Sequence, residues 1–306
     1  MTQGRLGTHT RMSEGKVEWP TVWVALGTYA LWALATTVLA AYWLPLGIIV
    51  AAWAIAQYGS LTHEVTHGHP FKNPTANAAL VAPALTLYIP YARFRDTHLD
   101  HHFNSDLTDP YDDPESNYLD PAVWAGLSGR TRSLLRFNNT LLGRLLVGPV
   151  VGQVAYLASE MRAIRNGDQR VIRGWLWHIP ALVPVFVWLS FAAMPVWAYL
   201  VAAYIGIALL KVRSFLEHRA HEDAKARTVI IEDRGLFALL FLNNNFHVVH
   251  HLHPKVPWYQ LPGLYARAPD KYLTRNDGYR YGSYAEIFRR YFLRAKDPVP
   301  HPLASD

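Results

Sequence analysis

Apolar residues dominate two long stretches of this 306-residue chain. From Trp19 to His63 there is no Lys, Arg, Asp or Glu, over roughly 45 residues where about 20 span a bilayer as a helix. A second uncharged stretch of roughly 37 residues runs from Gly174 to Leu210. Each stretch is about twice the spanning length. Each therefore predicts a helical hairpin that crosses the membrane and returns.

The turns of both predicted hairpins carry no basic residue. The first turn lies at Tyr42–Pro45 and the second at Ala193–Pro195, whereas Lys and Arg lie in the N-terminal tail, between the hairpins and after Leu210. By the positive-inside rule, both termini and the segment between the hairpins face the cytoplasm. The pattern thus predicts a multi-pass integral membrane protein.

The same pattern divides the chain into five segments and predicts an all-α membrane protein with four transmembrane helices in two hairpins and a cytosolic helical cap. An apolar piece between Lys72 and Arg93 contains Pro83 and Pro90 and is marginal for a full crossing, so we expect a re-entrant or interfacial segment there. The segments are a cytosolic tail (1–18), the first hairpin (19–66), a cytosolic or interfacial segment (67–173), the second hairpin (174–217) and the cap (218–306).

Charge and cysteine content narrow the function. The net charge of +6 follows from the expected topology and from attraction to anionic lipid heads, so it does not indicate a nucleic-acid partner. The chain has no Cys, which excludes disulfides, thiolate ligands and a cysteine nucleophile. The N-terminal tail lacks the short apolar core and cleavage site of a removable signal peptide, so we expect it to remain in the cytosol.

Twelve of the fifteen histidines fall in four short windows, all at predicted cytoplasmic ends of helices. Residues three and four apart share one face of a helix, so each window directs two or three imidazoles to one point. Imidazole is a common ligand of iron, copper and zinc, and this number exceeds the need of one small site. We therefore expect a centre with more than one metal ion. The windows are His63–His69, His98–His102, His218–His221 and His247–His253.

A zinc protease, a metal transporter and unconnected surface histidines are the alternatives to such a centre. The run from His63 to His67 also fits His-Glu-x-x-His, in which Glu64 would be the general base of an intramembrane zinc protease. That reaction needs only one further ligand and leaves both His-x-x-His-His windows unused. A metal transporter would hold its ion near the membrane midplane rather than beyond the helix ends. Unconnected surface histidines do not account for two windows of identical spacing.

The three boxes His-x-x-x-His, His-x-x-His-His and His-x-x-His-His occur in this order, with a hairpin between the second and third. In this respect the chain resembles the integral-membrane fatty-acid desaturase superfamily, over roughly residues 20–265, and within it the bacterial dihydrorhizobitoxine-desaturase-like branch. The segments Arg95–His102 and Asn243–Pro262 carry the resemblance most specifically, and His218 resembles the extra histidine after the fourth membrane helix.

The resemblance implies two non-haem iron ions as cofactors, with dioxygen as co-substrate, and a centre that is itself the catalyst. The bacterial branch leads us to expect an inner membrane, and the positive-inside rule predicts that the metal site is on its cytoplasmic side. Nine ligands follow by position: His63, His67, His98, His101, His102, His218, His247, His250 and His251.

A shell made only of neutral imidazoles leaves the charge of the irons to be offset nearby. Carboxylates that accept the second ring N–H would also fix the tautomer of each ligand. We expect such partners among the acidic residues close to the boxes, which are Glu64, Asp96, Asp100, Asp106 and Glu217.

The resemblance implies an oxidoreductase that introduces a double bond into a fatty acyl or lipid chain. Alternatives within the superfamily are a hydroxylase or a ketolase, acting on carotenoids or other lipids, and a desaturase of an amino-acid-derived substrate. No flavin, dinucleotide or haem-domain signature is evident in the sequence. We therefore expect electrons from a separate donor, a ferredoxin or a b-type cytochrome with its reductase.

Overall fold

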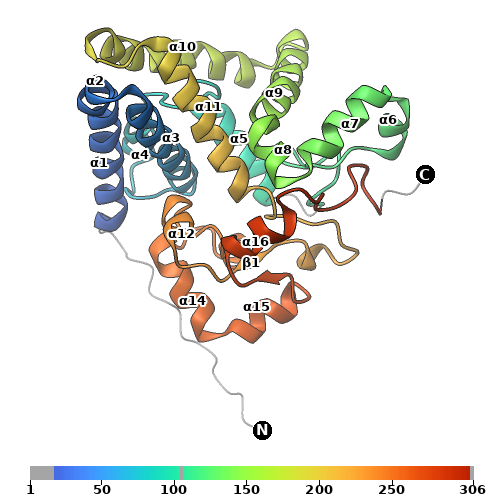
Figure 1. The fold of residues 1–306 in the computed structure, drawn as a ribbon. Coiled ribbons are helices and arrows are strands. Elements are labelled where there is room, and N and C mark those ends of the chain that lie inside the picture. The colour runs from blue at the N-terminus through green and yellow to red at the C-terminus, as the bar shows by residue number, and fades with distance from the viewer. Residues whose placement is uncertain (1–16, 104–105, 304–306) are drawn as a thin grey trace.

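The computed structural model describes residues 17–103 and 106–303, and helices make up most of this part of the chain (Figure 1). Within it, four helices are long and apolar enough to cross a membrane, which confirms the expected number. These helices are Trp19–Tyr42, made of α1 (Trp19–Leu34), a π-helical turn (Ala35–Leu39) and α2 (Ala40–Tyr42), then α3 (Leu44–Thr66), α10 (Gln169–Phe191) and α11 (Val196–Arg213).

Shorter elements connect and cap these helices. Between α3 and α10 lie α4 (Pro74–Leu80), α5 (Tyr91–Phe103), α6 (Pro121–Gly126), α7 (Gly129–Asn138), α8 (Leu141–Leu146) and α9 (Gly148–Arg165). After α11 the cap contains η2 (Ala224–Ala226), α12 (Leu236–Leu240), α13 (His247–Leu252), η3 (Trp258–Gln260), α14 (Leu261–Arg267), α15 (Pro269–Arg275) and α16 (Tyr284–Tyr291). The strands β1 (Ile230–Ile231) and β2 (Arg280–Tyr281) pair in parallel within the cap.

Local chemistry sets the ends of the long helices. Trp43 has extended backbone angles and separates α2 from α3, where a proline occupies the first turn and needs no N–H partner. The side chain of Asp168 caps α10 by accepting the backbone N–H groups of Arg170 and Val171. Pro195 precedes α11. The two short turns are therefore encoded by residues next to them in sequence.

The helix α3 lies at the centre of the bundle, between α1 and α11. Small residues allow the close approach of α11: a Cβ added at Gly206 would lie 2.9 Å from the Ala52 carbonyl oxygen and 2.9 Å from the Ile55 side chain. Helices in a bilayer associate through such close packing because lipid is as apolar as the side chains themselves. The interface therefore depends on the absence of a side chain at this position.

The segment between α4 and α5, residues 81–90, is not helical and packs partly buried against the long helices. Its carbonyl groups are instead satisfied by side chains of the long helices: Tyr29 and Tyr58 donate to the Leu80 and Val81 oxygens at 2.7 Å. The hydroxyl of Tyr199 donates to the Leu85 oxygen at 2.8 Å. Irregular backbone at this depth is tolerated only where protein surrounds it. The re-entrant or interfacial position expected from its two prolines stays a prediction.

The helix α10 runs across one end of the bundle (Figure 1). Near its start, the Trp175 indole N–H donates to Glu160 of α9 at 3.0 Å. Near its end, the Trp188 indole N–H donates to the Thr36 hydroxyl in the π-helical turn at 2.9 Å. These two hydrogen bonds attach the ends of α10 to α9 and to the first long helix.

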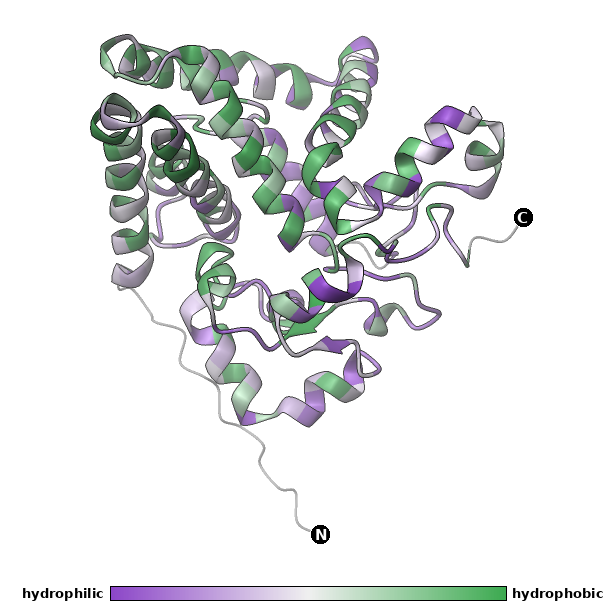
Figure 2. Ribbon diagram, viewed as in Figure 1, coloured by the Kyte–Doolittle hydropathy of each residue, from purple (hydrophilic) through white to green (hydrophobic). Residues whose placement is uncertain are grey.

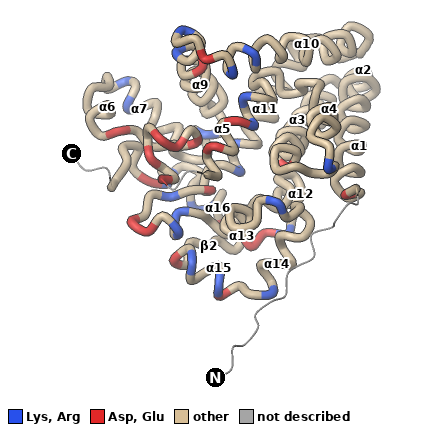
Figure 3. Tube along the Cα trace, turned by 180° about the vertical axis from the view of Figure 1, so that it is seen from behind, with Lys and Arg blue, Asp and Glu red and all other residues tan. Residues whose placement is uncertain are grey.

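Hydropathy and charge separate along the molecule. Apolar residues follow the long helices, whereas the cap and the region around α5 to α7 are more polar (Figure 2). Lys, Arg, Asp and Glu are sparse on α1, α3 and α10 and gather near the cap and α5 to α7 (Figure 3). Large apolar side chains on α10 are exposed, among them Trp177 at 73% and Phe191 at 87%. A contiguous apolar surface of this kind is typical of contact with lipid.

Candidate metal centre

Four parts of the chain deliver histidines to one region between the bundle and the cap. His63 lies in the last turn of α3, and His67 is the C-cap residue that directly follows the helix. The second box lies on α5 and the third on α13. His218 follows α11 by a few residues. All nine histidines expected as ligands thus lie in the same region of the fold.

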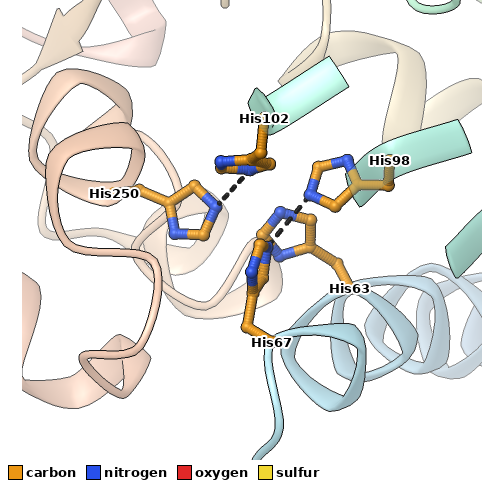
Figure 4. A group of neighbouring side chains, drawn as sticks. All are labelled: His63, His67, His98, His102 and His250. Atoms are coloured by element: carbon orange, nitrogen blue, oxygen red, sulfur yellow. Dashed lines mark hydrogen bonds between the residues drawn. The ribbon is translucent and has the colours of Figure 1, made fainter. Parts of the chain in front are cut away.

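The nine histidines form two groups in which the ligand atoms lie within 4.8 Å of one another. The first group, drawn in Figure 4, takes rings from α3, α5 and α13. The second joins α5, the segment after α11 and α13. The first group is His63, His67, His98, His102 and His250, and the second is His101, His218, His247 and His251.

Helix geometry accounts for the way in which each His-x-x-His-His box serves both groups. Consecutive residues project about 100° apart around a helix, and residues four apart share a face. On α5, His98 and His102 therefore point to the first group and His101 to the second. On α13, His247 and His251 point to the second group and His250 to the first.

The ring nitrogens in both groups face one another at 3.0–3.1 Å, in an arrangement that shared protons alone do not satisfy. The Nε2 atom of His218 is 3.0 Å from the Nε2 atoms of both His101 and His247. A ring nitrogen carries at most one proton, so these contacts cannot all be satisfied by shared protons. Nitrogens bound at about 2.1 Å and at right angles to one ion lie about 3.0 Å apart. The spacing and the donor set therefore fit a metal ion in each group.

Carboxylates hold two of the α5 rings from behind. Nδ1 of His101 lies 2.7 Å from an Asp113 oxygen, and Nδ1 of His98 lies 2.8 Å from a Glu115 oxygen. When Nδ1 donates its proton to a carboxylate, Nε2 presents its lone pair toward the centre. Neither carboxylate was expected as a partner from the sequence. The available signal was the position of this acidic stretch shortly after the second box.

A second network supports His247. Its Nδ1 lies 3.2 Å from the Asn244 side-chain oxygen and 3.8 Å from a Glu217 oxygen. The Asn244 amide donates to the same Glu217 oxygen at 2.7 Å, and the Arg213 guanidinium pairs with it at 3.1 Å. Glu217 therefore lies near a histidine, as expected, although Asn244 makes the direct contact. Asn244 was not recognised from the sequence.

The remaining four acidic residues expected beside the histidines have different surroundings. A Glu64 oxygen accepts a hydrogen bond from the backbone N–H of Trp258 at 2.8 Å. This contact differs from the one that the general base of a zinc protease would make. Asp96 pairs with Arg95 at 2.7 Å. Asp100 is exposed, and within the described residues it forms no ion pair or hydrogen bond. Asp106 is exposed and belongs to neither group of histidines.

Burial and mutual repulsion keep most of the rings neutral. Burial and the charges of His98 and His101 lower the pKa of His102 to about 3. Burial also places the pKa of His218, His247, His250 and His251 well below the usual histidine range. Burial opposes a charge on His101 as well, but Glu115 and Asp113 raise its pKa to about 9. A bound cation would reverse that preference, because like charges disfavour each other.

Comparison with known proteins supplies the family context. The family model described as fatty acid desaturase matches residues 37–283. A beta-carotene ketolase of Paracoccus sp. (strain N81106 / MBIC 01143) is 27% identical, over 78% of this chain and 86% of its own length. A fatty acid desaturase of Bacillus subtilis (strain 168) is 25% identical, over 76% and 71%. A chloroplastic omega-3 fatty acid desaturase of Brassica napus is 24% identical, over 80% and 65%.

Proposed function

The chain belongs to the fatty acid desaturase family, and on this premise we propose that it is a membrane desaturase that uses two iron ions and dioxygen to introduce a double bond into a fatty acyl chain. The observation that carries the proposal is the convergence of nine histidines from four separate segments into two groups. Family membership makes the protein an oxidoreductase of the desaturase superfamily and associates it with a lipid substrate and a membrane.

In the proposed enzyme, each group of histidines holds one iron through Nε2 atoms. The bound pair would supply the activation of dioxygen that removal of hydrogen from an unactivated methylene group requires. Asp113, Glu115 and Asn244 hold the ring orientation and the tautomer from the far side. The fully buried ring of His101 lies where bulk water has no access, which protects a reactive oxidant from side reactions.

A ketolase is the second candidate, because two of the relatives that match are beta-carotene ketolases. Relatives named as ketolases and as desaturases both match this chain, so the comparisons alone do not separate the two activities. Two further alternatives within the superfamily are hydroxylation of a lipid and desaturation of an amino-acid-derived molecule. The difference lies in which carbon atoms the fold presents to the centre and in whether oxygen stays on the product.

The proposed enzyme also has a defined orientation in the membrane and a separate electron donor. The protein lies in a bacterial inner membrane, with both termini and the histidine centre on the cytoplasmic side, as the distribution of basic residues favours. A separate ferredoxin, or a b-type cytochrome with its reductase, delivers the electrons.

The proposal is tested by expressing the chain with a competent electron donor in a bacterium and profiling lipids and metabolites. We expect a new unsaturated acyl chain with the wild type and none with the His101→Ala variant. Purified wild-type protein should contain two irons per chain, and the variant should contain fewer. The His253→Ala variant, which changes a half-buried histidine outside both groups, should retain product and iron.

Growth under ¹⁸O₂ separates the two candidate reactions. Desaturation removes two hydrogen atoms and, with two further electrons and two protons, converts dioxygen to two water molecules, so the lipid product carries no label. Ketolation leaves labelled oxygen on the carotenoid. One zinc ion per chain together with no oxidised or unsaturated product would overturn the proposal.

A further inference from the structure

A third cluster of metal-binding side chains lies outside the nine histidines. It consists of Glu18, immediately before α1, Glu64 on α3 and His69 in the loop after α3. Each of these residues offers one ligand atom, and the three atoms lie within 4.8 Å of one another. The side chains are only 12%, 5% and 6% exposed, respectively.

One ring nitrogen of His69 has no hydrogen-bond partner in the described part of the chain. Nδ1 of His69 lies 2.8 Å and 2.9 Å from the two oxygens of Glu18 and donates its proton there. Its Nε2 atom is buried and makes no hydrogen bond within the described residues. It lies 4.0 Å from a Glu64 oxygen, too far for a hydrogen bond. The Nε2 atom of His69 and a Glu64 oxygen thus face each other across a short buried gap.

The cluster is also acidic. One buried and one partly buried carboxylate lie beside one imidazole, and in the described part of the chain no Lys or Arg forms an ion pair with Glu18 or Glu64. A buried charge is retained when it is paired or when it coordinates a metal. A divalent cation carries two positive charges, which match the two carboxylates.

We propose that His69 Nε2 and Glu64 bind a third divalent metal ion and that Glu18 orients the histidine. Two bonds of about 2.1 Å can separate the ligand atoms by up to about 4.2 Å, so the observed gap accommodates an ion without rearrangement. A carboxylate that accepts the other N–H of a ligating histidine is the usual support of such a site. One nitrogen and carboxylate oxygens suit Mn²⁺, Fe²⁺ or Zn²⁺.

The ion would tie three segments together beside the histidine groups. Glu64 follows His63 directly, and the other Glu64 contact is the backbone N–H of Trp258, beyond the third box. Trp258 in turn donates its indole N–H to Thr21 of α1 at 3.2 Å. The site therefore fastens the start of α1 and the loop after the third box to the end of α3.

The site is tested by titrating Mn²⁺ into the full-length, iron-loaded protein in detergent and following free Mn²⁺ by electron paramagnetic resonance. Mn²⁺ binds more weakly than Fe²⁺ to a given set of ligands, so it should leave iron in place. We expect one Mn²⁺ per chain with the wild type and with the His253→Gln control. The His69→Gln variant should bind none while keeping its iron content.

The Glu18→Gln variant provides an independent measurement if the change at His69 affects folding. Loss of the orienting carboxylate should weaken Mn²⁺ binding by roughly 10- to 100-fold without abolishing it. A wild-type protein that binds no Mn²⁺, or a His69→Gln variant that binds it as the wild type does, would overturn the site. Iron content, measured in the same samples, reports separately on the centre formed by the nine histidines.

Discussion

Individual side chains behind the histidines decide how the rings are presented. Asp113 contacts Nδ1 of His101, and Glu115 contacts Nδ1 of His98. Both acidic residues lie in one turn, in which the Asp113 carboxylate also accepts hydrogen bonds from the backbone N–H groups of Thr108 and Glu115, at 2.8 Å and 2.9 Å. These backbone hydrogen bonds hold the Asp113 carboxylate in place independently of its contact with the His101 ring. A fixed acceptor imposes both the tautomer and the angle of the imidazole.

Replacement of Asp113 by Asn should weaken the centre while the chain still folds. The amide retains the size of the side chain but is a weaker acceptor for the Nδ1 proton of His101. We expect metal affinity or turnover to fall by roughly 10- to 100-fold. Iron content after dialysis against a chelator, measured by plasma spectrometry, checks this expectation.

Asp100 provides the matched control on the helix that carries the second box. It lies between His98 and His101 in sequence, is exposed and makes no ion pair or hydrogen bond in the described residues. The Asp100→Asn variant should retain wild-type iron content and turnover. Equal losses in the two variants would mean that net charge, and not the contact with His101, matters at this position.

At the scale of elements, the contact between α3 and α11 holds the two ends of the histidine centre together. The helix α3 ends in the first box and α11 leads into His218. Gly206 brings these helices together, and Arg213 at the end of α11 pairs with Glu217 beside His218. A change in their separation would shift one group of histidines relative to the other.

The Gly206→Ala variant should be less stable than the wild type. Its new methyl group would meet the Ala52 oxygen at 2.9 Å, and backbone cannot yield as a flexible side chain does. Overpacking of this kind costs about 1–3 kcal/mol, which thermal unfolding in detergent would detect as a lower midpoint. The Gly27→Ala variant is the control, because a Cβ there meets nothing within 4 Å. Similar midpoints for both variants would contradict the close contact.

At the scale of the whole molecule, apolar residues dominate the bundle and charged residues are more frequent in the cap (Figures 2 and 3). The histidine groups lie between these two parts, where α3, α5 and α13 meet. In the proposed enzyme, a centre in this position would receive an acyl chain from the lipid side and electrons from the aqueous side. The orientation of the molecule in the membrane would then decide which compartment supplies the electrons.

The absence of cysteine makes that orientation directly measurable. We expect a membrane-impermeant maleimide to label the exposed Ala193→Cys position between α10 and α11 in cells whose outer membrane alone is permeable. The Ala266→Cys position in the cap should react only after the inner membrane is opened. This order follows from the excess of Lys and Arg on the cap side. The reverse order would invert the proposed topology.

Short-range patterns in the sequence determined much of this protein. The four long helices follow from uncharged stretches of twice the spanning length, and box spacing on helices predicts that each window directs its histidines to one point; the full set of nine ligands was implied by the family resemblance. Both depend on residues within one or two turns of one another, where periodicity fixes which side chains share a face.

The tertiary structure decided the contacts between distant segments. Which histidines share a group depends on how α3, α5, α11 and α13 approach one another, and sequence spacing does not contain that information. The partners of His98 and His101 come from a turn rather than from the acidic residues nearest in sequence, since neighbours such as Asp100 project from another face of the same helix. Packing between elements, not local periodicity, brings Glu18, Glu64 and His69 together.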